Sequence, residues 1–308
     1  LISDHDAEPA GFLNGNRHHR YELMLNAHKE NGAAVTIAVM PVPIEEACRF
    51  GVMIADEKGK IMEFEEKPER PRSNLASMGI YIFNWKTLKR ALVEMAGQPA
   101  LDFGKHVIPY CHGKGAPMYT YEFMGYWKDV GTLDSYWQAN MELIDIVPEF
   151  NLYEEYWKVF TKSEIQPPQY FSDDSVVERS IIGEGTDVYG KVYNSVIGCG
   201  VTIGKNTVIR DSIIMNRTQV GNDCEMYKAI VAEEVRIGNH VRLGVGGEAE
   251  NDMAPHIYNR GIVTVGERTV IPNGITVGKN SVISGVTTGA DYENFSLGSG
   301  RTLIKAGD

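Results

Sequence analysis

The sequence predicts an α/β domain with a mixed sheet, followed by a parallel β-solenoid, and three observations support this. The chain has 308 residues, which suits about two domains of ordinary size. Strand and helix patterns alternate between residues 21 and 146, as they do in α/β domains. From Ser180 onward an aliphatic residue recurs every six positions, often followed by glycine. Short repeats at a fixed spacing indicate a solenoid whose coils cover one another.

The elements of the α/β part follow from local patterns. We expect helices over 21–31, 85–95 and 133–143, and strands over 35–39, 51–55, 61–65 and 80–83. Val35–Val39 is apolar and β-branched, as a buried strand should be. The segment Asp56-Glu57-Lys58-Gly59-Lys60 separates two strand patterns and has the composition of a hairpin turn. Thr132 precedes the last helix and is a suitable N-cap.

The solenoid pattern consists of aliphatic residues at six-residue spacing with two one-residue slips. The repeated residues are Ile197, Ile203, Ile209, Met215, then Val220, Met226, then Val231, Ile237, Leu243, and finally Val265, Ile271, Val277, Ile283. This spacing resembles the hexapeptide repeat of left-handed parallel β-helices. A β-sandwich with glycine turns is the alternative, but its turns would not hold a six-residue spacing for so long. Residues 245–261 break the pattern and should form a loop leaving one coil.

Composition excludes several classes of function. The net charge of −11 argues against a nucleic-acid partner, because a phosphate backbone needs a basic surface. No apolar run approaches the roughly 20 residues that cross a bilayer, so we expect no membrane partner. Cys48, Cys111, Cys199 and Cys224 lie far apart without CxxC spacing. They indicate reduced thiols in a cytoplasmic protein.

Three short segments of the α/β part contain residues suited to chemistry. Glu66-Lys67-Pro68 ends a strand, where a lysine can point into a crevice, although most such lysines are simply solvated. The small residues of 75–81 permit close approach of a ligand, or equally of a packed helix. Asp129, just before a glycine and a helix start, is suited to bind Mg²⁺, or alternatively to cap the helix or pair with a lysine.

Together these segments resemble one family. Glu66-Lys67-Pro68, Leu75–Phe83, Asp102-Phe103-Gly104-Lys105 and Tyr126–Tyr136, followed by hexapeptide repeats, are similar to the corresponding blocks of bacterial glucose-1-phosphate adenylyltransferases. The resemblance implies a Rossmann-like nucleotidyltransferase fold and synthesis of ADP-glucose and diphosphate from ATP and glucose 1-phosphate, the committed step of bacterial glycogen synthesis. It covers the chain from about Tyr21 to the C-terminus.

The resemblance also implies roles for particular residues. Gly51 would place backbone against the sugar phosphate, Glu66 would bind the glucose hydroxyls, and Lys67 would hold the phosphate. Ser77 would also contact glucose 1-phosphate. Asp129 would be one of two carboxylates that bind the catalytic Mg²⁺. Asp102, Phe103 and Trp127 are expected in supporting positions.

The first residues depart from the family pattern. No Gly-rich triphosphate-binding loop occurs in residues 1–50, and Asp4-His5 matches the family's Gly-Asp-His segment only weakly. We therefore leave residues 1–20 unassigned and expect only the C-terminal part of a nucleotidyltransferase domain over 21–147, a linker over 148–175, and the β-helix over 176–308. If these residues were the whole molecule, we would expect no adenylyl transfer, because ATP would lack its clamp.

Two other functions stay open. A non-catalytic regulatory or assembly subunit would use the β-helix for subunit contacts. A hexapeptide-repeat acyltransferase would need a histidine base, for which His240 and His256 are the candidates, although a lone histidine on a coil is usually a solvated corner residue. The family resemblance further implies a homotetramer, or a heterotetramer with a related subunit, controlled by sugar-phosphate or nucleotide effectors.

Overall fold

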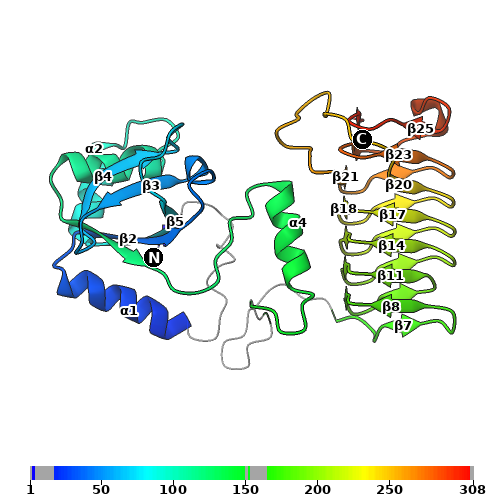
Figure 1. The fold of residues 1–308 in the computed structure, drawn as a ribbon, viewed down its shortest axis with the longest axis horizontal. Helices are drawn as coiled ribbons and strands as arrows, with labels where there is room; N and C mark the ends of the chain where they lie inside the picture. The colour runs from blue at the N-terminus through cyan, green and yellow to red at the C-terminus, as the bar shows by residue number, and fades with distance from the viewer. Residues whose placement is uncertain (1, 4–16, 150–151, 153–164, 306–308) are drawn as a thin grey trace. The chain divides into compact units, whose positions relative to one another are not determined.

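The computed structural model describes residues 2–3, 17–149, 152 and 165–305. The chain divides into two compact units, one formed by residues 1–128 with 152–159 and the other by 129–151 with 160–308. The first contains the mixed sheet and the second contains the solenoid (Figure 1). Within the described ranges, no helix has both the length and the apolar character needed to span a membrane.

The first unit is built on a six-stranded mixed sheet with the order β4-β3-β5-β2-β6, to which β1 adds by pairing with β5. Its strands are β1 (Ile2–Ser3), β2 (Val35–Pro41), β3 (Gly51–Ala55), β4 (Ile61–Glu66), β5 (Leu75–Phe83) and β6 (Met118–Glu122). Only β2 and β6 run parallel, and the other pairs are antiparallel. The sheet is therefore mixed, as the sequence predicts.

Helices cover both faces of this sheet. They are α1 (Arg17–Glu30), α2 (Trp85–Glu94) and α3 (Ile108–Gly113), with a 3₁₀ turn at Ala47–Arg49 and a π-helical turn at Phe103–Val107. Val35 and Ile37 pack with Leu88 of α2 on one face, whereas Ala38 packs with Met24 of α1 on the other. This alternation along β2 is the period of two that strand geometry imposes. Figure 1 shows α1 and α2 on opposite sides of the sheet.

The predicted elements of this unit are confirmed, with differences at their ends. The 56–60 hairpin joins the antiparallel strands β3 and β4. The helix expected from residue 21 begins at Arg17, and the strand expected over 80–83 begins at Leu75. Small residues such as Ala76 therefore lie inside a buried strand and do not precede one.

The second unit is a solenoid of three parallel sheets. One contains β7 (Tyr170–Phe171), β10 (Asp187–Val188), β13 (Thr202–Ile203), β16 (Gln219–Val220), β19 (Arg236–Ile237) and β22 (Val270–Ile271). Another contains β8 (Val176–Glu178), β11 (Lys191–Tyr193), β14 (Val208–Arg210), β17 (Glu225–Tyr227), β20 (Arg242–Val245), β23 (Thr276–Gly278) and β25 (Ser296–Leu297). The third contains β9 (Ile181–Ile182), β12 (Val196–Ile197), β15 (Ile213–Ile214), β18 (Ala229–Val231), β21 (Val263–Val265), β24 (Val282–Ser284) and β26 (Thr302–Ile304).

The coil length explains the slips in the sequence pattern. Ile203 pairs with Val220 and Val220 with Ile237, so these coils are 17 residues apart, one fewer than three six-residue repeats. The missing residue falls at one corner, between Ile209 and Ile214 in one coil. The prediction that Met215 points into the core is therefore wrong, since Ile214 occupies that position and is 1% exposed.

Two further features differ from the predicted boundaries or confirm them. Strand β7 pairs with β10 and so belongs to the first coil, although the linker was expected to extend to residue 175. The predicted loop over 245–261 is confirmed, because β20 ends at Val245 and β21 begins at Val263.

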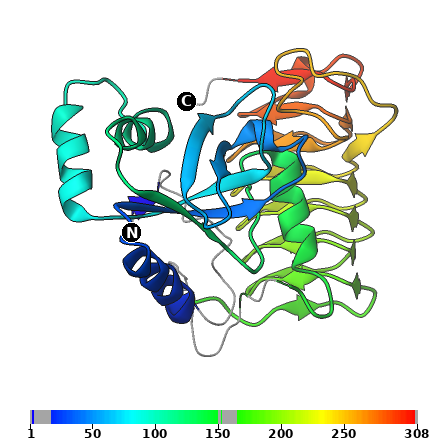
Figure 2. The ribbon, with the colours of Figure 1, turned by 60° about the vertical axis from the view of Figure 1, so that its left-hand side comes forward.

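Helix α4 (Leu133–Glu142) belongs to the solenoid unit. Its Leu133, Tyr136, Trp137 and Met141 pack on the outward side chains of Ile213, Ile230 and Ile262, and Figures 1 and 2 show it lying along the coils. Thr132 caps it as predicted, in a reciprocal capping box with Ser135. The helix expected at 133–143 is thus confirmed, and it packs on the solenoid.

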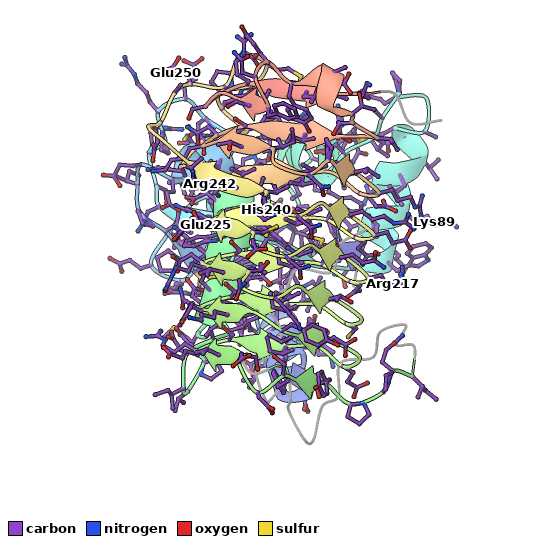
Figure 3. All side chains as sticks on the ribbon, turned by 90° about the vertical axis from the view of Figure 1, so that its right-hand side faces the viewer. Lys89, Arg217, Glu225, His240, Arg242 and Glu250 are labelled. Atoms are coloured by element: carbon purple, nitrogen blue, oxygen red, sulfur yellow. The ribbon has the colours of Figure 1, made fainter. Side chains whose placement is uncertain are left out.

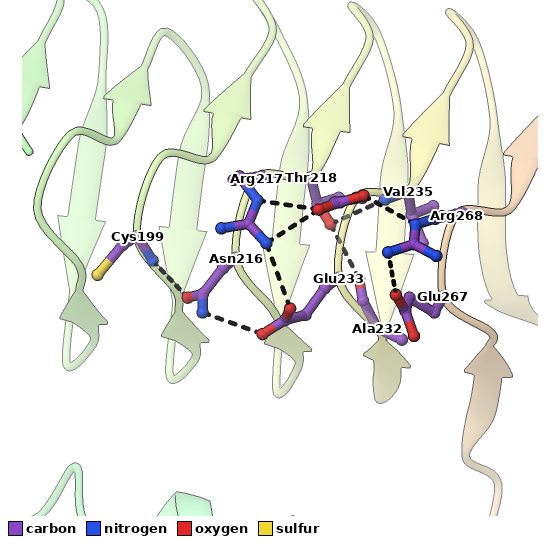
Figure 4. A network of polar contacts seen from close by, with 10 residues as sticks. Cys199, Asn216, Arg217, Thr218, Ala232, Glu233, Val235, Glu267 and Arg268 are labelled. Atoms are coloured by element: carbon purple, nitrogen blue, oxygen red, sulfur yellow. Dashed lines mark hydrogen bonds and ion pairs between the residues drawn. The ribbon is translucent and has the colours of Figure 1, made fainter. Parts of the chain in front are cut away.

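The outer corners of the coils carry stacked polar side chains. Arg217 and Arg268 both bond to the carboxylate of Glu234, at 2.9 and 3.0 Å, from coils on either side of it (Figure 4). Asn216 donates to Glu233 at 3.1 Å and accepts from the backbone N–H of Cys199. These rows arise because equivalent residues of successive coils lie directly above one another.

Candidate active site in the mixed-sheet unit

The Glu66-Lys67 pair lies where β4 ends, beside the first strand residue of β3. Gly51 of β3 is the register partner of Glu66, and the N–H of Lys67 donates to the carbonyl of Phe50 at 3.0 Å. Lys67 has φ 47°, a left-handed conformation that turns the chain away from the strand. Its side chain is exposed and has no hydrogen bond or ion pair with the described residues. The ammonium is therefore available to an anion.

The carboxylate of Glu66 lies close to two buried glycines. A Cβ built on Gly51 would come within 2.8 Å of Glu66 Oε2, and one built on Gly104 would come within 2.6 Å of the same oxygen. Neither glycine has a positive φ, so the close approach of the carboxylate explains these glycines. The expectation that Gly51 faces a sugar phosphate stays a prediction, and the structure shows that a glycine here makes room for Glu66.

Ser77 and Tyr81 meet on one face of β5 because the strand is bulged. Ile37 and Val39 of β2 pair with Tyr81 and Ser77, so β5 holds two extra residues over this stretch. Gly79 lies in the bulge with φ 71°, which glycine adopts without strain. The two hydroxyls are 3.4 Å apart. A Cβ built on Gly79 would meet no atom within 4 Å. The glycine is therefore explained by the backbone conformation of the bulge and not by a closely packed helix.

Asp102 and Phe103 begin the π-helical turn and extend this cluster. The ring of Phe103 stacks on Tyr81 with centroids 5.9 Å apart and an angle of 8° between planes. The carboxylate of Asp102 accepts a hydrogen bond from the Lys105 N–H at 2.6 Å, and its own N–H donates to His106 Nδ1 at 3.0 Å. Asp102 therefore fixes the start of the turn, which agrees with a supporting role. π-Turns are often found at functional sites.

Trp127 packs against Phe50 with ring centroids 5.6 Å apart, and Phe50 is the residue whose carbonyl accepts the hydrogen bond from the Lys67 N–H. Its indole N–H is buried and has no acceptor among the described residues. A buried donor without a partner carries a desolvation cost, and an oxygen of a bound ligand would remove it.

Asp129 is the first residue of the solenoid unit. Its Oδ1 accepts a hydrogen bond of 3.3 Å from the N–H of Gly131, and the residue is half-buried. Because Thr132 caps α4, helix capping does not explain Asp129. In the described part of the chain no three acidic, histidine or cysteine residues gather into a metal cluster. A single carboxylate still fits Mg²⁺, which commonly takes one or two protein oxygens and completes its shell with phosphates and water.

The structure thus brings together seven of the eight predicted site residues within the first unit: Gly51, Glu66, Lys67, Ser77, Asp102, Phe103 and Trp127. Tyr81, Gly104 and His106 were not predicted, but they lie against Ser77, Glu66 and Asp102 respectively. The sequence contains signals for two of them. Tyr81 lies four residues after Ser77 with Gly79 between them, and Gly104 lies within the Asp102–Lys105 block.

Arg72 holds the loop that follows the Glu66-Lys67 pair. Arg72 forks onto two carboxylates of β4, bonding to Glu63 and, through Nε at 2.7 Å, to Glu65. The hydrogen bond and charge of Arg72 lower the pKa of Glu63 below its usual value. Arg72 thereby ties the 67–74 segment back to the strand that carries Glu66.

The histidine required by the acyltransferase alternative gains no support. His240 lies at an exposed corner with φ 58°, and its Nδ1 is 3.9 Å from Asp223 (Figure 3). His256 lies exposed in the 245–261 loop. Both fit solvated positions.

Comparisons with known proteins show which families the two units resemble. A nucleotidyl transferase model matches residues 1–146, which includes the segment left unassigned above, and a GlmU-like C-terminal hexapeptide model matches 168–265. A glucose-1-phosphate adenylyltransferase of Lachnospira eligens is 61% identical over 94% of this chain and 68% of its own length. Those of Acetivibrio thermocellus and Thermotoga maritima are 45% and 46% identical, over 94% and 99% of this chain and 68% and 73% of theirs. Nucleotidyltransferases of this kind use a divalent metal. The chain belongs to the glucose-1-phosphate adenylyltransferase family.

Proposed function

We propose that this protein transfers the adenylyl group of ATP to glucose 1-phosphate, forming ADP-glucose and diphosphate as the committed step of bacterial glycogen synthesis. The observation that carries this proposal is the Glu66-Lys67 pair. The carboxylate of Glu66 lies close to Gly51 and Gly104, and the next residue carries an exposed ammonium that has no partner among the described residues. Such a pair suits a ligand with hydroxyls at one end and a phosphate at the other.

We assign the binding roles accordingly. Glu66 accepts hydrogen bonds from the glucose hydroxyls, and Lys67 binds the phosphate. Ser77 contacts the same substrate, and Gly51 places its backbone against the sugar phosphate. Asp102 and Phe103 support this site through the π-turn and the stack on Tyr81. The buried N–H of Trp127 supports a ligand oxygen in its vicinity.

The reaction needs no protein nucleophile. A phosphate oxygen of glucose 1-phosphate attacks the α-phosphorus of ATP, and the bond from that phosphorus to the departing diphosphate breaks. Lys67 offsets the charge of the attacking phosphate, which would otherwise repel the triphosphate. Mg²⁺ bound at Asp129 would stabilise the charge that develops on the α-phosphoryl oxygens.

The wider setting is part of the same proposal. We infer that the enzyme is a tetramer assembled with the help of the solenoid, and that sugar-phosphate or nucleotide effectors control it. The four cysteines are free, which supports a cytoplasmic location.

Calorimetric titration of the chain with glucose 1-phosphate, and separately with Mg·ATP, tests the proposal. We expect glucose 1-phosphate to bind and Lys67→Ala to weaken it at least tenfold, because a charge-assisted contact is lost. Lys89→Ala on α2 is the matched control, since Lys89 is exposed and also lacks a partner among the described residues (Figure 3). If neither ligand binds, the regulatory or assembly subunit becomes the better interpretation.

A further inference from the structure

The π-turn that follows Asp102 is fastened at both ends. The N–H of Val107 bonds to the carbonyl of Asp102 at 3.2 Å, and the N–H of Ile108 bonds to the carbonyl of Phe103. The Asp102 carboxylate and His106 Nδ1 satisfy two more backbone N–H groups of the same turn. The backbone of Gly104 is therefore held in one position.

A side chain at position 104 would collide with one group. The three atoms nearest to a Cβ built there are Glu66 Oε2, Cδ and Oε1, at 2.6, 3.0 and 3.3 Å. All three belong to the carboxylate of Glu66. A Cβ built on Gly51 would also lie 2.8 Å from the same Oε2, but it would meet the ring of Phe64 at 2.9 Å as well. Gly104 thus limits where the carboxylate can lie and touches nothing else as closely.

We propose that Gly104 is a positioning residue, which keeps the carboxylate of Glu66 in the position where it accepts hydrogen bonds from the sugar hydroxyls. This inference rests on the proposed role of Glu66 in binding glucose 1-phosphate. A group held in place before the ligand arrives loses little conformational freedom on binding. The recognition of the sugar then depends on a residue that makes no contact with it.

Gly104→Ala tests this with little disturbance of the fold. The clashing atoms are the terminal atoms of a flexible side chain and not backbone, so we expect the carboxylate to move and the backbone to stay. Lys67 is untouched, so the grip on phosphate remains. We expect glucose 1-phosphate to bind about tenfold more weakly, which corresponds to about 1.4 kcal/mol. The preference for glucose 1-phosphate over galactose 1-phosphate should fall, whereas the affinity for inorganic phosphate should not change.

Gly113→Ala is the matched control. Gly113 ends α3 in the same unit, and a Cβ there would meet nothing within 4 Å. The same added methyl group should leave both the affinity and the sugar preference as they are. A merely structural effect of adding a methyl group to this unit would not change the preference between two epimers.

A double-mutant cycle with Glu66→Ala separates the possible outcomes. If Gly104 acts through Glu66, adding Gly104→Ala to Glu66→Ala should weaken binding no further. Additive losses, or an unchanged sugar preference in Gly104→Ala, would overturn the inference while leaving the role of Glu66 standing. Unchanged binding in Glu66→Ala alone would overturn the proposed role and the inference with it. Should Gly104→Ala unfold, Glu66→Ala must restore folding in the double variant, and failure to do so also refutes the inference.

Discussion

The indole N–H of Trp137 donates a hydrogen bond of 2.7 Å to the backbone carbonyl of Asp211, and this bond fastens α4 to a corner of the solenoid. The ammonium of Lys228, one coil further on, lies 4.6 Å from the centre of the same ring. Asp129, our proposed metal ligand, precedes α4 by only a few residues. The position of its carboxylate within this unit therefore depends on how α4 docks.

Replacing Trp137 with phenylalanine should loosen α4. Trp137→Phe keeps an aromatic ring on the solenoid but leaves the Asp211 carbonyl without its donor, which costs about 1–2 kcal/mol. We expect a lower thermal midpoint and faster hydrogen–deuterium exchange at the amides of α4, with less change elsewhere.

Trp85→Phe is the control for this variant. Trp85 begins α2 and is 66% exposed. Replacing it makes the same chemical change at a side chain that is largely in solvent. Equal exchange rates in α4 for the two variants would show that the Trp137 bond does not hold the helix.

The four free cysteines should differ sharply in reactivity. Burial raises the pKa of the Cys111 and Cys224 thiols and also blocks access to them, whereas Cys199 is exposed and Cys48 is half-buried. Because the thiolate is the reactive form, iodoacetamide should label Cys199 first, Cys48 more slowly, and the other two only on unfolding. Peptide mass spectrometry at successive times measures this order, and Cys199→Ser should remove the fastest phase. Early labelling of Cys224 would contradict the burial seen here.

The last coil should lose stability in acid. The Lys305 ammonium, bonded at 2.8 Å, together with the Thr288 N–H and hydroxyl, lowers the pKa of Asp291 to about 2 from an ordinary value of 3.8. A carboxyl whose folded pKa is depressed stabilises the fold above its unfolded pKa, and this contribution is lost as the pH falls through the folded value. The loss should therefore occur between about pH 4 and pH 2.

Asp291→Asn isolates this contribution, because asparagine does not titrate over this range. Above pH 5 the variant should have the lower thermal midpoint, and the difference from the original protein should shrink as the pH falls from 4 to 2. A difference that stays constant down to pH 2 would mean that the Lys305 pair does not stabilise the coil.

The solenoid could be predicted because its buried positions are visible in the sequence as aliphatic residues at a fixed spacing. What the spacing alone did not reveal is why it slips. Asn194, Asp211 and Lys228 are 17 residues apart and all have left-handed φ values of 45–50° at the shortened corner. Ile214 and Met215 are both apolar, so periodicity could not tell which one faces the core. The same corner receives Trp137, a contact between residues 74 positions apart that no local pattern encodes.

The candidate site was predictable where a residue's chemistry is local. Glu66 and Lys67 stand side by side at a strand end, and the Asp102–Lys105 block is a short segment. The sequence could not show why residue 104 is a glycine, because strand pairing and the π-turn bring it to Glu66 from 38 residues away. Tyr81 was likewise missed, since only the bulge at Gly79 lets its hydroxyl reach Ser77.

The coil corners stack so closely that adding a methyl group there should lower the stability of the solenoid. A Cβ on Gly221 would lie 2.6 Å from both the carbonyl carbon and the oxygen of Gly238 in the next coil. These are backbone atoms in a parallel ladder, so they cannot move aside as a side chain would. Gly221→Ala should cost at least about 2 kcal/mol, as overpacking does, and lower the thermal midpoint by roughly 5 °C or more. In Gly298→Ala the nearest atom is Arg301 Cγ at 3.7 Å, an ordinary contact, so that variant should melt within about 2 °C of the original. If the two variants melted alike, glycine at the corners would reflect chain flexibility and not the distance between coils.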